Sequence, residues 1–305
     1  MSAVSASLVK ELREKTGAGM MDCKKALTET DGDLEAAVDW LRKKGIASAS
    51  KKSGRVAAEG KVVVAAGGNQ GLLLEVNSET DFAAKNEKFI SFANTAVQVG
   101  LEAKVSDVEL LAGLPYPGTG RSVGEELTAM ISSVGENMNL RRVARLEAAQ
   151  GVVVGYLHMG GKIGTLVSLE SEAADQDALR ELGKKIAMHV AASTPLYLNR
   201  EQVPNSDLER ERSVLADQAR ASGKPESIID KMVQGRLSKF YADNCLVEQP
   251  FIMDPEQAVQ AVVDGVAKSV GASIRVSGFA RFMMGEGLQK REEDFAAEVA
   301  KQMGQ

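Results

Sequence analysis

The sequence offers few side chains that could carry covalent chemistry. It contains two histidines, His158 and His189, and two cysteines, Cys23 and Cys245, all far apart in the chain. No C-x-x-C pair or Cys/His spacing marks a metal or redox site. No serine lies in a G-x-S-x-G elbow, and neither cysteine has a nearby basic partner that would activate it. We therefore expect no catalytic residues and no metal.

The histidines have simpler interpretations than catalysis. His189 falls seven residues after Leu182, on or beside an apolar helical stripe, which favours a packed core histidine. His158 comes at the end of an expected strand beside a glycine turn, where an ordinary edge residue is expected.

The glycine-rich segments do not match nucleotide-binding motifs. The stretch from Gly155 to Lys162 approaches a P-loop, but its spacing is wrong and Ile163 stands where Ser or Thr is required. Gly285-Glu286-Gly287 lacks the third glycine of a dinucleotide fingerprint. The turn at 67–71 joins strand to strand, so it presents no helix N-terminus to an anion. These glycines are interpreted as turn residues, and no cofactor is expected.

Composition narrows the class of protein further. The 305 residues are 44% hydrophobic and 26% charged with a net charge of -5, as in a globular protein of more than one domain. An acidic balance argues against direct binding of nucleic acid. No apolar stretch approaches the roughly 20 residues that span a bilayer, and the start of the chain does not resemble a signal peptide. Free cysteines and these absences favour a cytoplasmic protein.

Residues 5–50 have the pattern of three short helices. Apolar residues recur there at three- and four-residue spacing, at Leu8, Val9, Leu12, Leu34, Ala37, Val38 and Leu41. Residues 17–19 break the first helix, Asp22 is placed to start the second, residues 31–33 precede the third, and Gly45 is expected to end it. Trp40 is expected inside this bundle. The basic stretch Ser48 to Arg55 is interpreted as a linker.

From about residue 56 the pattern changes to strands and longer helices, twice over. The expected strands are 61–66, 72–76, 140–146, 151–156, 164–169 and 274–282. Aligning Gly71 with Gly164 also aligns the core positions of the two following helices, pairing Phe89 with Leu182, Ala93 with Ile186 and Val97 with Val190. This match suggests an internal duplication. An insertion, residues 206–244, delays the last strand. It has the pattern of a helical hairpin, with helices at 207–221 and 226–241, and it either seeks a partner or folds back on its own domain.

Two long stretches of the sequence are distinctive. They are Ser7 to Leu27, which contains Thr16-Gly17-Ala18-Gly19-Met20-Met21-Asp22-Cys23-Lys24-Lys25, and Glu75 to Lys85, centred on Thr80-Asp81-Phe82. Both resemble signatures of the bacterial elongation factor Ts family. Further matches follow in the same order at residues 135–137, 186–192, 222–225 and 249–251. The resemblance therefore covers nearly the whole chain.

The resemblance implies an α+β fold of several parts. These are an N-terminal three-helix module similar to ubiquitin-associated domains, two duplicated α/β core subdomains with antiparallel three-stranded sheets, a helical-hairpin insertion and a C-terminal helix. We divide the chain accordingly at 1–54, 55–150, 151–285 with the insertion at 206–244, and 286–305. The C-terminal helix is expected from Glu286 to Met303, with Phe295, Val299 and Met303 on one side. Residues 115–120 are richer in proline and glycine than this family usually is, which leaves the form of that loop open.

The resemblance also implies a function in protein synthesis. Members exchange guanine nucleotide on the GTPase elongation factor Tu, which needs differential binding and no covalent chemistry. By resemblance, Asp81 and Phe82 intrude near the magnesium and phosphate site of the GTPase, with Thr80 at the start of the same motif. Spacing alone leaves a second interpretation, because Phe82 lies seven residues before Phe89 and could extend its buried stripe. Asn86 could instead cap that helix and leave Phe82 in the preceding loop.

Further contacts with elongation factor Tu are implied by the same resemblance. Met20, Met21 and Lys24 are expected on its nucleotide-binding domain, although one of the two methionines is expected to pack within the bundle. His158, supplemented by residues of the insertion, is expected to contact a second region; these residues are Met232, Val233, Gly235 and Arg236. The C-terminal helix either packs on the GTPase or docks on its own core. The hairpin offers a possible homodimer contact.

One alternative from another class remains. The helical module at 5–50 could serve a ubiquitin- or peptide-binding adaptor. That function would require the module to suffice alone and Phe82 to be irrelevant.

Overall fold

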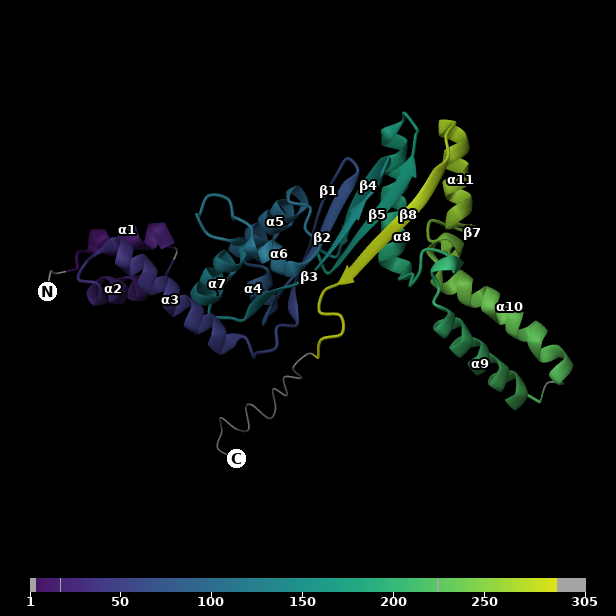
Figure 1. Cartoon of the computed structure of the whole chain (residues 1–305), viewed down its shortest axis with the longest axis horizontal. Helices are drawn as coiled ribbons and strands as arrows, with labels where there is room; N and C mark the ends of the chain where they lie inside the picture. Colours follow the sequence, from purple (N-terminus) through teal and green to yellow (C-terminus); the bar gives the residue numbers. More distant parts are fainter. Residues whose placement is uncertain (1–3, 17, 224, 290–305) are drawn as a thin grey trace. The chain divides into compact units, whose positions relative to one another are not determined.

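The computed structural model describes residues 4–16, 18–223 and 225–289, and it has a mixed α+β fold (Figure 1). The chain forms two compact units. Unit 1 holds the described parts of Met1–Val62, Leu74–Val143 and Met283–Gln305, and unit 2 holds Val63–Leu73 and Ala144–Phe282. The four-domain division given above stays a prediction.

Unit 1 begins with the expected three-helix module. Its helices are α1 (Ala6–Thr16), α2 (Met20–Glu29) and α3 (Leu34–Lys52). Asp33 caps α3 by accepting a hydrogen bond from the backbone N–H of Ala36 at 2.9 Å. The buried core of the module consists of Val9, Leu12, Cys23, Ala26, Leu27 and Ala37. Trp40 is only partly buried and packs against the edge of this core.

The expected end of the third helix at Gly45 was wrong. Helix α3 continues to Lys52, so most of the stretch interpreted as a linker is helical. Gly45 is buried, and a Cβ atom added there would lie 3.8 Å from Cβ of Ser132 in α7 (Val123–Val134). Such a distance is an ordinary van der Waals contact. Gly45 therefore lies inside α3, on the face that packs on α7, and it does not end the helix.

The first sheet has the strand order β1-β2-β3. Residues 80–82 follow the end of its central strand, β2. The strands are β1 (Glu59–Gly67), β2 (Gln70–Ser78) and β3 (Met138–Glu147). Between β2 and β3 lie α4 (Asp81–Ala84), α5 (Glu87–Glu102), α6 (Val108–Gly113) and α7. Ser122 and Glu125 form a capping box at the start of α7, and Gly135 ends it with a φ of 89°.

The loop at 115–120 is an ordered turn. Pro115 and Ser122 form an isolated antiparallel β-bridge, and the backbone N–H of Tyr116 donates to the carbonyl of Arg121 at 2.7 Å. The ring of Tyr116 stacks on Phe92 of α5 with a centroid distance of 5.7 Å. The prolines and glycines therefore shape a hairpin-like turn that packs on α5.

Unit 2 repeats the order strand, strand, helix, strand. Its sheet has the order β4-β5-β8, with β4 (Gly151–His158), β5 (Ile163–Ser171) and β8 (Ile274–Met283), of which Met283 belongs to unit 1. Helix α8 (Gln176–Ser193) packs on β4 and β5. The three aligned pairs of helix residues predicted to be core are all buried, at Phe89, Ala93, Val97, Leu182, Ile186 and Val190. This agreement supports the duplication.

Two glycines let the tip of the first hairpin pack closely on the second sheet within unit 2. A Cβ at Gly155 would lie 2.5 Å from Cγ2 of Val64, and one at Gly71 would lie 2.8 Å from Cδ2 of Leu166. At such distances a neighbouring side chain would have to shift to admit a Cβ atom, so glycine is favoured at this contact.

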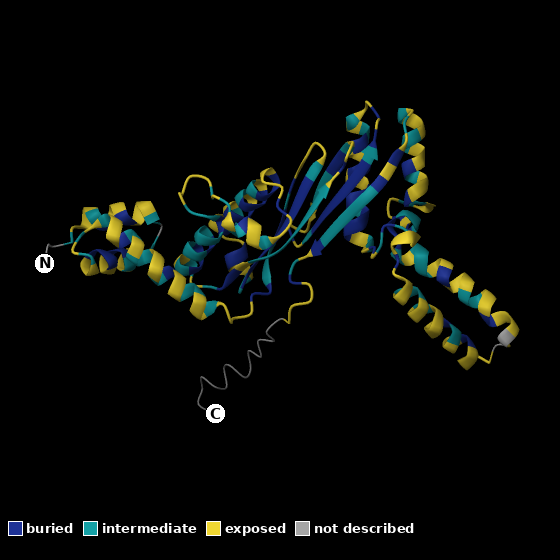
Figure 2. Cartoon of the chain, in the orientation of Figure 1, coloured by how far each residue is buried: buried dark blue, intermediate teal, exposed yellow. Residues whose placement is uncertain are grey.

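The insertion forms the expected helical hairpin, which is largely exposed in Figure 2. Helices α9 (Asn205–Ala221) and α10 (Glu226–Asn244) pack on each other through buried Leu215, Ala219, Ile229 and Leu237. The buried apolar residues of α10 are therefore covered mainly by α9.

Several elements were not expected from the sequence. Among them are the short helices α4 and α6, the two-stranded sheet of β6 (Pro250–Phe251) and β7 (Asp254–Ala258), and helix α11 (Val259–Val270). At the other end of the chain, residues 284–287 form a turn, and the expected C-terminal helix lies almost entirely outside the described residues.

Candidate functional site

Thr80, Asp81 and Phe82 lie directly after strand β2. Thr80 caps the one-turn helix α4, because its Oγ1 accepts a hydrogen bond from the backbone N–H of Ala83 at 3.2 Å. Phe82 is 81% exposed, the highest exposure among the large apolar side chains described in this chain. A large aromatic held outside any core is unusual and marks a candidate contact residue.

A lysine on the next turn sets the electrostatics of this segment. Lys85 Nζ lies 2.6 Å from Oδ2 of Asp81 and 5.9 Å from the centre of the Phe82 ring. The hydrogen bond from Lys85, assisted by its charge, lowers the pKa of Asp81. Asp81 is therefore an ionised acceptor beside an exposed ring, suited to groups that donate hydrogen bonds or carry positive charge.

Phe82 does not extend the buried stripe of α5. Asn86 caps α5 by accepting from the backbone N–H of Lys88 at 2.9 Å, so the helix that carries Phe89 begins after Phe82. Phe89 is fully buried. The seven-residue spacing between the two phenylalanines is therefore not the spacing of one continuous helix.

Two loops of unit 1, at residues 79–80 and 136–137, hold the start of α4. They do so through hydrogen bonds to each other's glutamate, here called the carboxylate clasp. Glu136 accepts from the backbone N–H of Thr80 at 3.0 Å and from its hydroxyl at 2.8 Å. In return, Glu79 accepts from the backbone N–H of Asn137 at 2.5 Å. Each loop thus donates a backbone N–H to the glutamate of the other.

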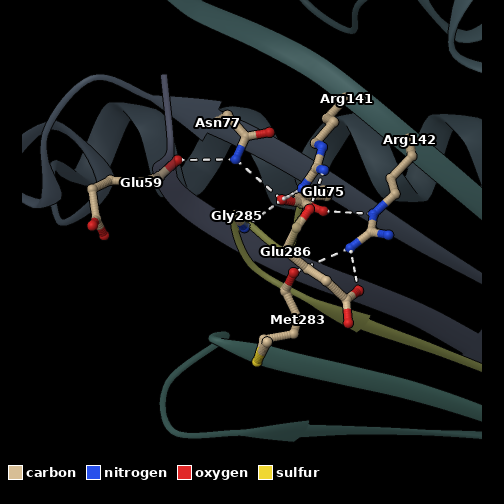
Figure 3. Close-up of polar contacts among 8 residues, drawn as sticks. All are labelled: Glu59, Glu75, Asn77, Arg141, Arg142, Met283, Gly285 and Glu286. Atoms are coloured by element: carbon tan, nitrogen blue, oxygen red, sulfur yellow. Dashed lines mark hydrogen bonds and ion pairs between the residues drawn. The ribbon is translucent and has the colours of Figure 1, made fainter. Parts of the chain in front are cut away.

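A second carboxylate, Glu75, anchors the strand that leads to this segment (Figure 3). Its side chain is fully buried, with Oε1 2.9 Å from Arg141 Nη1 and 2.8 Å from the backbone nitrogen of Gly285, and Oε2 2.7 Å from Arg142 Nε. Asn77 donates to Oε1 at 3.1 Å. Burial alone would raise the pKa of Glu75, but the hydrogen bonds from these four donors together outweigh it and lower the pKa.

The same cluster fixes the turn that follows β8. Arg142 Nη2 donates to the carbonyl of Met283 at 3.1 Å and lies 3.2 Å from Oε2 of Glu286. Gly285 has a φ of +72°, and a Cβ there would lie 2.4 Å from the carbonyl oxygen of Ala58. Strands β2 and β3 and the turn at 284–287 are therefore held together by one buried charge.

Met20, Met21 and Lys24 lie together on α2. Lys24 is exposed, and the two methionines are 59% and 75% exposed. The expectation that one methionine packs within the bundle was wrong, because Cys23, Ala26 and Leu27 fill the inner face of α2. Two exposed thioether side chains form an adaptable apolar surface.

The remaining predicted contact residues lie on two elements of unit 2. His158 is exposed at the end of β4, pairs with Ile163 of β5, and its Nδ1 lies 3.0 Å from the hydroxyl of Tyr156. On α10, Met232 and Val233 are half-buried and Gly235 is exposed. Arg236 is exposed and donates to Oε1 of Gln218 at 2.9 Å, so it links the two arms of the hairpin.

The remaining histidine and the two cysteines are buried. His189 is fully buried between Oε1 of Gln249, 2.9 Å from its Nε2, and the backbone N–H of Ile252, which donates to its Nδ1 at 3.2 Å. The prediction of a core histidine is confirmed. Burial raises the pKa of both cysteines, to about 11 for Cys245. Among the described residues no group of His, Cys, Asp and Glu could hold a metal ion, and none of the described helices is long and apolar enough to cross a membrane.

Glu75, Glu79 and Glu136 lie within the stretches that resemble the family, but no role was predicted for any of them. For Glu75 a signal was present, because a carboxylate inside the apolar run 72–76 must find partners, and two adjacent arginines at 141 and 142 lie in the neighbouring strand. For Glu136 the sequence gives no comparable signal. Its partner lies 56 residues earlier in the chain.

Comparison with known proteins gives a consistent result. The family model described as Elongation factor TS matches residues 79–286. A protein of Magnetococcus marinus called Elongation factor Ts is 62% identical over 299 residues, covering 98% of each chain. A protein of the same name from Rhodospirillum centenum is 57% identical over the full length of both chains, and one from Paramagnetospirillum magneticum is 54% identical over 100% of this chain and 98% of its own.

Proposed function

This chain belongs to the elongation factor Ts family and is a translation elongation factor, and from that premise we propose that it is the guanine nucleotide exchange factor of elongation factor Tu. In this proposal it binds the GTPase, displaces GDP by disturbing the magnesium and phosphate site, and so allows GTP to load. It acts in the cytoplasm.

The mechanism requires only a difference in binding. A protein that binds the nucleotide-free GTPase more tightly than the GDP-bound form must, by thermodynamic linkage, weaken GDP binding by the same factor. A coupling of about 3 kcal/mol corresponds to roughly 150-fold. No covalent step is needed, so the binding surfaces carry the entire function.

The observation that carries the proposal is the exposure of Phe82 on a braced one-turn helix. An aromatic side chain that is 81% exposed can enter an apolar slot of the partner without first leaving a core of its own. Asp81, ionised beside it, can accept hydrogen bonds from partner groups that otherwise face the magnesium and phosphates. Thr80 sets the start of the helix that presents both.

Further contacts extend the binding surface in this proposal. Met20, Met21 and Lys24 meet the nucleotide-binding domain of elongation factor Tu, and Lys24 supplies a positive charge next to the two thioethers. His158 meets a second region of the partner, together with the segment Met232–Arg236. The C-terminal helix expected at 286–303 adds a contact of its own. A homodimer through α9 and α10 is a separate proposal, for which the seam covered by α9 offers little free apolar surface.

The experiment measures release of fluorescent GDP from elongation factor Tu by stopped flow, with unlabelled GDP in excess. The wild-type chain is expected to accelerate release. Phe82→Ala is expected to lower the second-order rate of exchange by about 30-fold or more, the value of a hot spot of about 2 kcal/mol. Leu110→Ala is the matched control, because Leu110 is an apolar residue of unit 1 that is 56% exposed and outside every proposed contact.

The two parts of the proposal fail separately. Without acceleration by the wild-type chain the exchange function is wrong. Full activity of Phe82→Ala would contradict only the role of Phe82.

A further inference from the structure

Helix α4 is too short to hold its own shape. It has four residues. An isolated helix of that length is unstable in water, because ordering the backbone of the first turn costs more free energy than its hydrogen bond gains. The bond from the Ala83 N–H to Thr80 Oγ1 closes that turn, but it does not fix the turn to the rest of unit 1. Burial of Ala83 and Ala84 holds the inner side of the turn, and the bonds to Thr80 set the orientation of its start, which carries Phe82.

Two side chains hold Thr80: Ser78 donates its hydroxyl to the Thr80 carbonyl at 2.9 Å, and the other side chain is Glu136. Both of its carboxylate oxygens are used, one by the backbone N–H and the other by the hydroxyl of Thr80, at 3.0 and 2.8 Å. Two bonds from one planar carboxylate to one residue fix orientation as well as position. Because Phe82 lies two residues after Thr80, that orientation is passed directly to the exposed ring.

The loop that carries Glu136 is itself rigid. Gly135 ends α7 in the left-handed conformation, with its N–H bonded to the carbonyl of Ile131 at 3.0 Å, and β3 begins at Met138. Between them, Asn137 is buried and donates through Nδ2 to the carbonyl of Arg55 at 2.7 Å. Glu136 thus projects from a corner fixed by a helix end on one side and a strand on the other.

The reciprocal bond strengthens this arrangement. Glu79, adjacent to Thr80, accepts the N–H of Asn137 and lies 3.3 Å from Arg55 Nη1. Rotation of the Thr80 loop would break bonds on both glutamates together. Such a double link suits a segment that must keep its shape when it is pushed against a partner.

We propose that Glu136 is a positioning residue for nucleotide exchange, which holds α4 in the orientation that presents the ring of Phe82 to the GTPase. The proposal rests on the exchange function proposed above. Glu136 acts through Thr80 and need not touch the partner. Its contribution to exchange is therefore expressed only while Phe82 is present.

The test is a double-mutant cycle in the full chain with fluorescent GDP release as the readout. Glu136→Ala is expected to lower the rate of exchange by about tenfold, because part of the binding free energy is then spent on ordering α4. Phe82→Ala lowers it by about 30-fold, and the double variant is expected to lose no more than that. A double variant slower by the product of the two factors, about 300-fold, would overturn the proposal, because independent effects multiply. So would an unchanged rate for Glu136→Ala.

A second readout does not involve the partner. Amide hydrogen exchange at Ala83 and Ala84 is expected to quicken in Glu136→Ala, because α4 opens more often. Unchanged protection there overturns the proposal even if the exchange function holds. If instead the wild-type chain fails to release GDP, the exchange function is wrong, and with it the role assigned to Glu136.

Two further variants keep the test decisive. Glu126→Ala removes another half-buried glutamate of unit 1, which bonds Arg121 Nη1 at 3.1 Å, and it should leave exchange unchanged. If Glu136→Ala does not fold, Glu136→Gln keeps the size of the side chain but replaces one acceptor oxygen by an NH₂ group, which cannot accept a hydrogen bond from Thr80. Glu136→Gln is expected to slow exchange only when Phe82 is present. An unchanged rate for Glu136→Gln would overturn the proposal.

Discussion

Replacing Glu75 with glutamine tests whether one buried charge holds unit 1 together. The substitution keeps the shape of the side chain but removes its charge and places an NH₂ group among donors. Arg141 and Arg142 then lose their common counter-ion while their side chains remain only 21% and 30% exposed. Removing one partner of a buried ion pair costs about 3–5 kcal/mol. We expect about 3 kcal/mol, the lower end, because water reaches both arginines and Glu286 still faces Arg142.

The assay is thermal unfolding followed by circular dichroism at pH 7. A loss of about 3 kcal/mol corresponds to a fall in Tm of about 6–12 °C for a domain of 150–250 residues. Glu14→Gln is the matched control, since Glu14 faces Lys10 at 3.8 Å with a side chain that is 69% exposed, and such pairs contribute little. If Glu75→Gln unfolds within 1 °C of the wild type, as the control should, the buried cluster does not stabilise the fold and the reasoning is refuted.

The stability difference between the wild type and Glu75→Gln should depend on pH. The folded chain holds the pKa of Glu75 below its ordinary value, so the unfolded chain binds more protons as the pH falls. The stability that this carboxylate adds is fully present above the ordinary glutamate pKa of about 4.3 and is lost as the pH drops through the lowered folded value. The gap in Tm between wild type and Glu75→Gln should therefore narrow below about pH 4. A gap that stays constant to pH 3 would contradict the assigned ionisation.

Two further predictions concern unit 2 and are read by urea unfolding. Gly155→Ala should destabilise the protein by about 1–3 kcal/mol, because the new Cβ would lie 2.5 Å from Cγ2 of Val64. Gly265→Ala is the control, because Gly265 of α11 has open space around it and alanine there should be neutral or stabilising. Equal stabilities of the two variants would refute the steric argument. His189→Leu should cost about 1–3 kcal/mol by leaving the groups that bond its ring unpaired, Gln249 among them. Since burial lowers the pKa of His189, wild-type stability should also fall as the pH drops below about 6.5, a decline that the leucine variant should lack; a variant that keeps the decline would contradict this role.

Much of the fold could be predicted from local sequence, because the spacing of apolar residues and the position of glycine turns determine most strands and helices. The strands 61–66 and 164–169 were found because apolar β-branched residues lie between glycine turns, and the structure extends them by a few residues to β1 and β5. Gly45 was misread for a physical reason. A glycine that ends a helix and a glycine inside a helix look the same in sequence. The packing of α3 on α7, which brings Gly45 next to Ser132, joins residues 87 positions apart.

The candidate site divides in a similar way. Spacing left Phe82 either buried on the α5 stripe or exposed before it, and the cap at Asn86 decides in favour of exposure. The residues that support Phe82 could not be found, because Glu136 and Thr80 are joined only when β2 and β3 pair side by side. Long-range polar contacts of this kind follow from topology, which local periodicity does not contain.

The need for support follows from what an exchange factor has to do. The free energy by which it weakens GDP binding equals the difference between its own binding free energies for the nucleotide-free and GDP-bound GTPase. Equal binding to both states would not accelerate GDP release. A mobile Phe82 could adapt to the GDP-bound partner as readily as to the empty one, which would reduce that difference. In the proposed mechanism a ring held in one orientation would fit one state and clash with the other, so that rigidity at Thr80 would turn binding into discrimination. On this reasoning Glu136→Ala should reduce the ratio of affinities for nucleotide-free and GDP-bound elongation factor Tu more than it reduces affinity for the GDP-bound form, and titration calorimetry with both forms can measure that ratio.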